Sequence, residues 1–135
     1  MQITRQADYA LRAMVYLSSL KTDQKAATSL IAEKQEIPPS FLAKIVSQLS
    51  IAGLINTARG ARGGVSLARP ADEISVLDVV EAIDGPVYLN ECTKIANDCP
   101  FLDTCPLKGM WCEARDELIE RLSSATFAHV NVPAG

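Results

Sequence analysis

The sequence contains no apolar run long enough to cross a membrane. A transmembrane helix needs roughly 18 or more consecutive apolar residues, and polar or charged residues interrupt every apolar stretch of this chain before that length. The first twenty residues carry Arg5, Asp8 and Arg12 and offer no small-residue cleavage site, so they are not typical of a signal peptide. We therefore expect a cytoplasmic protein with no membrane partner.

Histidine is nearly absent, and cysteine is absent outside one short segment. His129 is the only histidine, and no cofactor fingerprint or catalytic combination of His and Asp accompanies it. These absences argue against an enzyme. The four cysteines all fall within 21 residues: Cys92, Cys99, Cys105 and Cys112. Because cytosolic thiols stay reduced, this concentration favours a metal or iron–sulfur site over structural disulfides.

Charge is divided unevenly along the chain. Residues 1–70 hold nine Lys or Arg and four Asp or Glu, a balance of +5, whereas residues 71–135 hold four and twelve, a balance of −8. A basic half can approach phosphates, and an acidic half is repelled by them. The N-terminal half is therefore the candidate for a nucleic-acid surface. A chance distribution over a solvated surface is the alternative.

The most regular helical pattern begins at Pro39 and continues to about residue 52. Pro39 suits the first position of a helix, a short helix capped at Thr28 or Ser29 precedes it, and Gly53 ends it. Its apolar residues gather on one side. The other side is small, polar and free of acidic groups, and such a surface fits a DNA major groove. That side consists of Ser40, Ala43, Lys44, Ser47 and Gln48.

Two short strand-like runs follow at residues 54–58 and 65–68, and a Gly-rich turn with Arg59 and Arg62 joins them. A short helix, a turn, a patterned helix and such a hairpin make a winged helix-turn-helix. We expect the two arginines to contact the DNA backbone or minor groove. Base edges or adjacent phosphates would be contacted by Ser40, Lys44, Ser47 and Gln48. The alternative is a winged helix used for protein contacts.

Two further helices complete the expected fold. Ser75 and Asp78 resemble a capping box, and Gly85 ends the helix that they begin. After the cysteines, apolar residues recur at helical spacing from Trp111 onward, and Arg115 falls among them. They form an apolar stripe on one helix face, which a partner subunit would cover.

We therefore predict a mainly α protein with a small β-hairpin. It has a winged helix-turn-helix domain over 1–85, a cysteine-rich cluster-binding loop over 86–110, a long C-terminal dimerisation helix over 111–128 and a tail over 129–135. A homodimer would place two reading helices about 34 Å apart on a roughly palindromic operator in double-stranded DNA.

The cysteine spacing, Cys-x6-Cys-x5-Cys-x6-Cys, matches no common metal motif. Zinc ribbons pair their cysteines as Cys-x2-4-Cys, and no such pair occurs here. Iron–sulfur clusters accept longer ligand loops, and Cys99-Pro100 and Cys105-Pro106 repeat the Cys-Pro pair of bacterial ferredoxins, although the ferredoxin spacings differ. Spacing alone favours an iron–sulfur cluster and leaves zinc and free thiols open.

Several segments together carry a specific resemblance: Ile3-Thr4, Asp8-Tyr9-Ala10-Leu11-Arg12, Ile37-Pro38-Pro39-Ser40-Phe41-Leu42, Gly53-Leu54-Ile55, Arg59-Gly60-Ala61-Arg62-Gly63-Gly64, Leu77-Asp78-Val79-Val80-Glu81-Ala82-Ile83, Cys92, Cys99, Cys105 and Trp111. They are similar to the bacterial winged-helix iron–sulfur regulator family of IscR, NsrR, RirA and CymR. The resemblance covers about residues 1–125. It implies a homodimeric repressor or activator that often holds a [2Fe–2S] or [4Fe–4S] cluster on three cysteines and a fourth ligand.

The fourth ligand is where this sequence departs from its relatives. The residue three places after Cys105 is a histidine in IscR and is Lys108 here, which cannot bind a metal while it is charged. The resemblance to NsrR instead implies Asp8, offered by the partner subunit. Cys112 is the rival, and a solvent or small-thiol ligand stays open. The alternative role of Asp8 is an ion pair with Arg12 one helical turn away, and that of Cys112 is a small buried side chain.

The resulting hypothesis is a DNA-binding transcriptional regulator, expected to repress. Its operator affinity would be controlled by an iron–sulfur cluster that senses nitric oxide, iron or cluster supply, or redox stress. A first alternative keeps the fold but senses through thiols or a partner enzyme without a cluster, as in the CymR branch. A second is an iron–sulfur or zinc redox protein, which would leave Arg59, Arg62 and the polar helix face unexplained.

Overall fold

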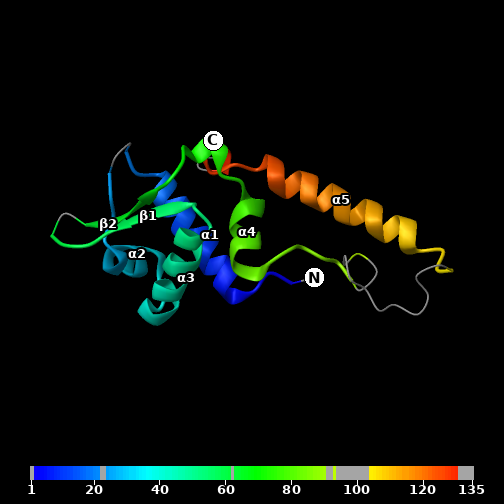
Figure 1. The fold of residues 1–135 in the computed structure, drawn as a ribbon, viewed down its shortest axis with the longest axis horizontal. Coiled ribbons are helices and arrows are strands. Elements are labelled where there is room, and N and C mark those ends of the chain that lie inside the picture. Colours follow the sequence, from blue (N-terminus) through cyan, green and yellow to red (C-terminus); the bar gives the residue numbers. More distant parts are fainter. Residues whose placement is uncertain (1, 22–23, 62, 91–92, 94–103, 131–135) are drawn as a thin grey trace.

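The computed structural model describes residues 2–21, 24–61, 63–90, 93 and 104–130. Its elements are, in order, α1 (Arg5–Ser18), α2 (Thr28–Gln35), α3 (Pro39–Ile51), β1 (Ile55–Ala58), β2 (Gly64–Leu67), a 3-10 helix (Ala71–Glu73), α4 (Val76–Asp84), α5 (Lys108–Ser124) and α6 (Phe127–Val130). β1 and β2 pair antiparallel. The predicted class, a mainly α winged helix-turn-helix with a β-hairpin and a long C-terminal helix, is confirmed (Figure 1). None of the described helices is long and apolar enough to cross a membrane.

α1 contacts α2, α3, α4, α6 and β2, and the winged domain is built around it. Thr4 caps the helix, because its Oγ1 accepts a hydrogen bond from the Ala7 amide at 3.1 Å. The same hydroxyl donates to Asp84 at the end of α4, at 2.5 Å. The buried face follows helical spacing and is made of Ala7, Ala10, Ala13, Met14 and Leu17.

The turn between α2 and α3 sets the direction of α3. Glu36 ends α2 in the left-handed conformation, with φ 53° and ψ 46°, which is uncommon for a residue that carries a side chain. Pro39 is the first residue of α3, as predicted. Ile37 and Leu42 flank this helix start and are both buried in one core cluster, as expected for a hydrophobic staple.

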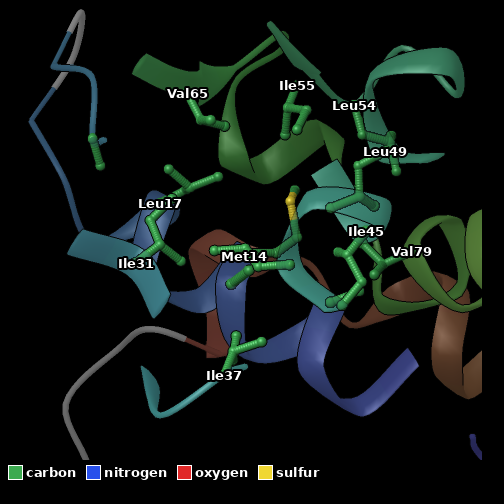
Figure 2. Packing of buried hydrophobic residues seen from close by; sticks show 14 of the residues in the cluster. Met14, Leu17, Ile31, Ile37, Ile45, Leu49, Leu54, Ile55, Val65 and Val79 are labelled. Atoms are coloured by element: carbon green, nitrogen blue, oxygen red, sulfur yellow. The ribbon is translucent and has the colours of Figure 1, made fainter. Parts of the chain in front are cut away.

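One core joins the helix-turn-helix to the hairpin. Figure 2 shows Met14 among side chains from α2, the turn and α3, and Val65 of β2 belongs to the same cluster. Ala26 forms an isolated bridge with Val65, with N···O distances of 3.0 and 2.8 Å. Gly64 permits this approach, because a Cβ at that position would lie 2.8 Å from the Ala26 carbonyl oxygen. The hairpin is therefore anchored at its base.

α4 begins with the predicted capping box. The Ser75 hydroxyl accepts from the Asp78 amide at 3.1 Å, and the Asp78 carboxylate accepts from the Ser75 amide at 3.0 Å. The end of the described chain returns to this place, where the Phe127 amide donates to the Ile74 carbonyl at 3.1 Å. Phe127 is 1% exposed, so α6 contributes to the core of the winged domain.

α5 differs from the helix predicted over residues 111–128. It begins at Lys108 and ends at Ser124, because Ala125 is extended (φ −86°, ψ 104°) and Thr126 bridges to Ser75. Residues 127–130 form α6, which includes His129, the first residue of the expected tail. No residue of α5 is buried. Figure 1 shows α5 extending from the winged domain on the side opposite the hairpin, so the described chain leaves its apolar stripe partly uncovered.

Candidate nucleic-acid interface and cysteine segment

The polar face of α3 lies on the surface. The opposite face is held in the core by three side chains that are at most 1% exposed, Leu42, Ile45 and Leu49. Ser40, Lys44 and Ser47 are exposed. Hydroxyl and ammonium groups on one accessible helix face can donate hydrogen bonds to base edges or phosphates. The structure thus brings three of the predicted DNA contacts together on one side of the reading helix.

Gln48 lies at the edge of this face. It follows Ser47 by one residue, which is about 100° around the helix axis, and it is half-buried. Its Oε1 atom is shielded from solvent and has no hydrogen-bond partner within the described part of the chain. A buried acceptor that lacks a hydrogen-bond donor raises the free energy of the folded protein. Reorientation of the Gln48 amide toward a donor would therefore be favourable. Its contact with a base edge stays a prediction.

The hairpin carries Arg59 beside α3. Arg59 directly follows β1 and is exposed, whereas Arg62 lies outside the described residues. A hollow of about 530 Å³ lies between the hairpin and α3, and its polar lining includes Ser47, Ser50, Thr57 and Arg59. Hydroxyl groups and a guanidinium around one hollow can accommodate the phosphate backbone of a duplex.

Asp8 lies on the exposed side of α1. Its carboxylate accepts a hydrogen bond from Arg12 at 3.0 Å, so the ion pair considered as its alternative role is present. The Asp8 and Arg12 side chains are 57% and 43% exposed, and an exposed helical pair of this kind contributes only about 0.3–0.5 kcal/mol. Such a weak pair leaves the carboxylate accessible. Ion pairing within one chain is therefore compatible with metal binding in a dimer.

Arg12 also connects α1 to the helix-turn-helix. Its guanidinium donates to the Gln35 carbonyl oxygen at the end of α2, at 3.2 Å. Carbonyls in the last turn of a helix lack partners within it and attract cations. The Arg12 Cζ lies 5.0 Å from the centroid of the Tyr9 ring, and Tyr9 packs edge-on against Phe41 of α3. The exposed side of α1 thus contacts both helices of the helix-turn-helix, α2 and α3.

Two of the four cysteines belong to the described chain. Cys105 precedes α5 and Cys112 lies within it, and both are free and partly exposed. Cys92 and Cys99 lie outside the described residues. Within the described residues, no group of three or more His, Cys, Asp or Glu side chains is placed to hold a metal ion. The predicted ligand set includes Cys92, Cys99 and a carboxylate from a second subunit, so the described part of one chain cannot assemble it.

The described residues in and next to the cysteine segment, residues 92–105, carry two features that sequence reasoning missed. The Thr93 Oγ1 accepts from the Leu89 and Asn90 amides at 3.1 and 3.3 Å and donates to the Asn90 carbonyl at 2.9 Å. Arg115 of α5 donates to the Val87 carbonyl at 2.9 Å. A charged residue inside an apolar helical stripe was the signal that could have indicated such a role for Arg115. The Thr93 turn had no comparable signal.

Known sequences are similar to this chain over most of its length. Residues 3–132 match the profile of the Rrf2 family, which is described as "Iron-dependent Transcriptional regulator". Protein aau3 of Rhizobium meliloti (strain 1021) is 35% identical over 127 residues, which make up 93% of this chain and 82% of that protein.

Solved structures share the fold over almost the whole chain. CymR (YrzC), the global cysteine regulator of B. subtilis, has a TM-score of 0.80 and 25% identity, covering 97% of this chain and 96% of that one. The oxidized form of Staphylococcus aureus CymR has a TM-score of 0.78 and 27% identity, covering 100% and 99%. T. potens IscR has a TM-score of 0.77 and 24% identity, covering 100% and 94%. This chain belongs to the Rrf2 family of transcriptional regulators.

Proposed function

We propose that this Rrf2 protein is a homodimeric, cytoplasmic DNA-binding repressor whose operator affinity is controlled by an iron–sulfur cluster. The observation that carries the proposal is the position of the cysteine segment between two helices of the DNA-reading fold. α4 precedes the segment and packs on α1 and α3, while α5 follows the segment and contacts α4. A change within the segment can therefore reach the reading helix through packed elements.

The DNA-binding surface would combine α3 and the hairpin. Ser40, Lys44 and Ser47 would contact base edges or adjacent phosphates, with Gln48 at the edge of the same face. Arg59 and Arg62 would contact the backbone or minor groove, where a guanidinium binds phosphate well. The exposure of α3 and the hollow beside it support this arrangement.

The cluster would be held by Cys92, Cys99 and Cys105, with Asp8 of the second subunit as fourth ligand and Cys112 as its rival. Thiolates are the usual ligands of [2Fe–2S] and [4Fe–4S] clusters, and the unpaired Cys105 and the exposed Asp8 carboxylate fit this donor set. When bound, such a cluster supplies a group that reacts with nitric oxide or oxidants. The residues of the chain would hold that group, and its loss would change the affinity of the reading helix for DNA.

Asp8 offers a route for that transmission. A bond from Asp8 to metal would withdraw the carboxylate from Arg12, whose guanidinium also holds the end of α2. A contact at this position would bias the orientation of the helix-turn-helix relative to α1. Couplings of this kind typically contribute about 1–3 kcal/mol, or 5- to 150-fold in affinity.

An anaerobic preparation tests the proposal. The absorption spectrum and the iron and sulfide contents would be measured first, followed by mobility shifts with promoter DNA before and after chelation or nitric oxide. We expect bound iron and sulfide, and a change in DNA affinity of at least about fivefold on cluster loss. Equal DNA affinity with and without the cluster would contradict cluster control. Absence of specific binding in both states would contradict the assignment as a DNA-binding regulator.

A cluster-free regulator of the same fold is the second candidate. It is favoured by the likeness to CymR, which includes an oxidized form of the Staphylococcus aureus protein, and by the two free, partly exposed thiols. This candidate predicts a colourless protein whose DNA affinity changes on treatment with an oxidant. Cys105→Ser or Cys112→Ser would then remove the response.

A further inference from the structure

Arg115 connects the parts of the chain that lie before and after the cysteine segment. Its Nε atom donates to the Val87 carbonyl at 2.9 Å, across 28 residues of sequence. Its guanidinium carbon lies 5.6 Å from the centroid of the Tyr88 ring, within the range of a cation–π interaction. One side chain of α5 therefore contacts two consecutive residues of the connection that leaves α4.

This contact is partly protected from solvent. The Arg115 side chain is 27% exposed and Val87 is 3% exposed. A carbonyl in such a place needs a hydrogen-bond donor, and Arg115 provides one. Asp116 also approaches the guanidinium, at 3.9 Å, but it is 78% exposed, so its pairing contributes little. Among the described residues, the contact with Val87 and Tyr88 is thus the main interaction of this guanidinium.

Three features follow one another along the chain that leaves α4. Gly85 ends α4 with a positive φ of 80°. Arg115 then holds Val87 and Tyr88, and the Thr93 hydroxyl closes the turn that follows. Of these three, only the Arg115 contact reaches across to α5. It therefore joins residues 87 and 88 to α5, in addition to the packing of α4 on α5.

We propose that Arg115 is a positioning residue for the metal site. By holding residues 87 and 88 against α5, beside the packing of α4 on α5, it fixes the path of the chain that leaves α4 relative to α5 and slows the loss of metal. The consequence for metal rests on the proposed function, whereas the contact itself does not. Lysine would be a poor replacement, because a single ammonium group lacks the planar fork that serves both the carbonyl and the ring.

The first experiment uses metal-free protein and asks whether the contact orders the connection. Hydrogen exchange of the peptide that spans residues 86–93 would be compared in the wild type, in Arg115→Ala and in Arg121→Ala. Arg121 is an exposed arginine near the end of the same helix and serves as the matched control. We expect faster exchange in Arg115→Ala alone. Unchanged exchange in this peptide would overturn the proposal.

The second experiment measures how fast a chelator removes iron from the anaerobically purified dimer. Loss should be about tenfold faster in Arg115→Ala, at the lower end of the 10- to 100-fold range of residues that hydrogen-bond a metal ligand, because Arg115 contacts Val87 and Tyr88 and acts on the ligands through the chain. Arg115→Lys should be intermediate, and Arg121→Ala should match the wild type. DNA affinity of the metal-free variants should stay unchanged, and circular dichroism should show each variant folded under the conditions of the iron assay, which separates positioning from a general loss of folding. If Arg115→Ala does not fold, Arg115→Lys and Tyr88→Leu provide the same comparison.

The two experiments distinguish failure of the positioning role from failure of the proposed function. Faster exchange with an unchanged rate of iron loss would overturn the positioning role. A wild-type protein that holds no iron would contradict the proposed function, and the exchange experiment would still decide whether Arg115 orders the connection.

Discussion

The winged domain and α5 differ in how they use apolar residues. α1, α3, α4 and β2 each contribute side chains that are at most 2% exposed, among them Met14, Ile45, Val79 and Val65. α5, with 17 residues the longest of the described helices, contributes none. Because apolar burial is the main favourable contribution to folding, the winged domain contains the basis of its own stability. α5 needs a cover from outside the described chain, and a second subunit would supply it.

The two regions also differ in charge. Lys44 and Arg59 are exposed on the side proposed to contact DNA. The exposed residues of α5 include Glu113, Asp116, Glu117 and Glu120 together with Arg121. Figure 1 places the hairpin and α5 at opposite ends of the molecule. Because Lys44 and Arg59 attract phosphates and the exposed carboxylates of α5 do not, DNA would approach from the hairpin side and leave α5 free for dimer contacts.

The largest effect is expected where α6 joins the winged domain. Phe127→Ala removes a ring that is 1% exposed and should lower the free energy of unfolding by about 3–5 kcal/mol. Urea denaturation of the metal-free protein would measure this. Val130→Ala in the same short helix, at a residue that is 45% exposed, should change it by less than about 0.5 kcal/mol. Similar values for the two variants would show that α6 does not belong to the domain core.

The next largest effect is expected on dimer dissociation, through the apolar stripe of α5 that a partner subunit would cover. Leu118→Asp places a charge in the apolar stripe, where a partner subunit would have to desolvate it. We expect dimer dissociation to increase at least about tenfold, or roughly 1.4 kcal/mol, as measured by light scattering over a concentration series. Glu117→Gln, on the exposed side of the same helix, should leave the dimer unchanged. A wild type that is monomeric at micromolar concentration with full DNA affinity would refute the dimer.

A third test compares the two candidate fourth ligands, one in each region. Asp8→Ala should retain much of the iron but remove the difference between cluster-loaded and cluster-free DNA affinity, a coupling of about 1–3 kcal/mol. Cys112→Ala should change neither quantity appreciably. Iron content and mobility shifts in both variants provide the measurement. If Cys112→Ala loses its colour while Asp8→Ala keeps both the colour and the switch, the assignment is reversed.

Within the winged domain, the preference for particular operator base pairs should depend on side chains of α3. Gln48→Ala should change the preference at one base pair by about 1–3 kcal/mol if the amide makes a bidentate contact. A binding series over single-base variants of the operator would measure it. Ser47→Ala on the same helix serves as comparison. An unchanged preference at every position would mean that the shielded amide of Gln48 is structural.

The smallest expected effect is that of the hairpin arginines. Arg62→Ala and Arg59→Ala should each weaken binding to all sequences alike. Each should reduce the slope of log affinity against log salt by about 0.9 if one phosphate contact is lost. Titrations at several salt concentrations would show this. An unaltered slope and affinity would refute the role of the hairpin in backbone contact.

Features of this protein that depend on neighbouring residues could be predicted from the sequence. Pro39 at the start of α3, the Ser75–Asp78 capping box and the separation of polar and apolar faces on α3 are all present in the structure. These features were predictable because caps and helix faces involve residues within one or two turns of each other. The order of such elements was sufficient to indicate a winged helix-turn-helix.

Features that depend on distant contacts were decided by the tertiary structure. Ala125 fits the apolar spacing of α5 whether or not the helix continues, and the helix ends there because the chain turns to pair with residues 74–76 and bury Phe127. Arg115 likewise belongs to a helical stripe in the sequence, yet its partner lies 28 residues away. Helical periodicity reports which face of a helix is apolar, but it carries no information about which distant group will meet that face.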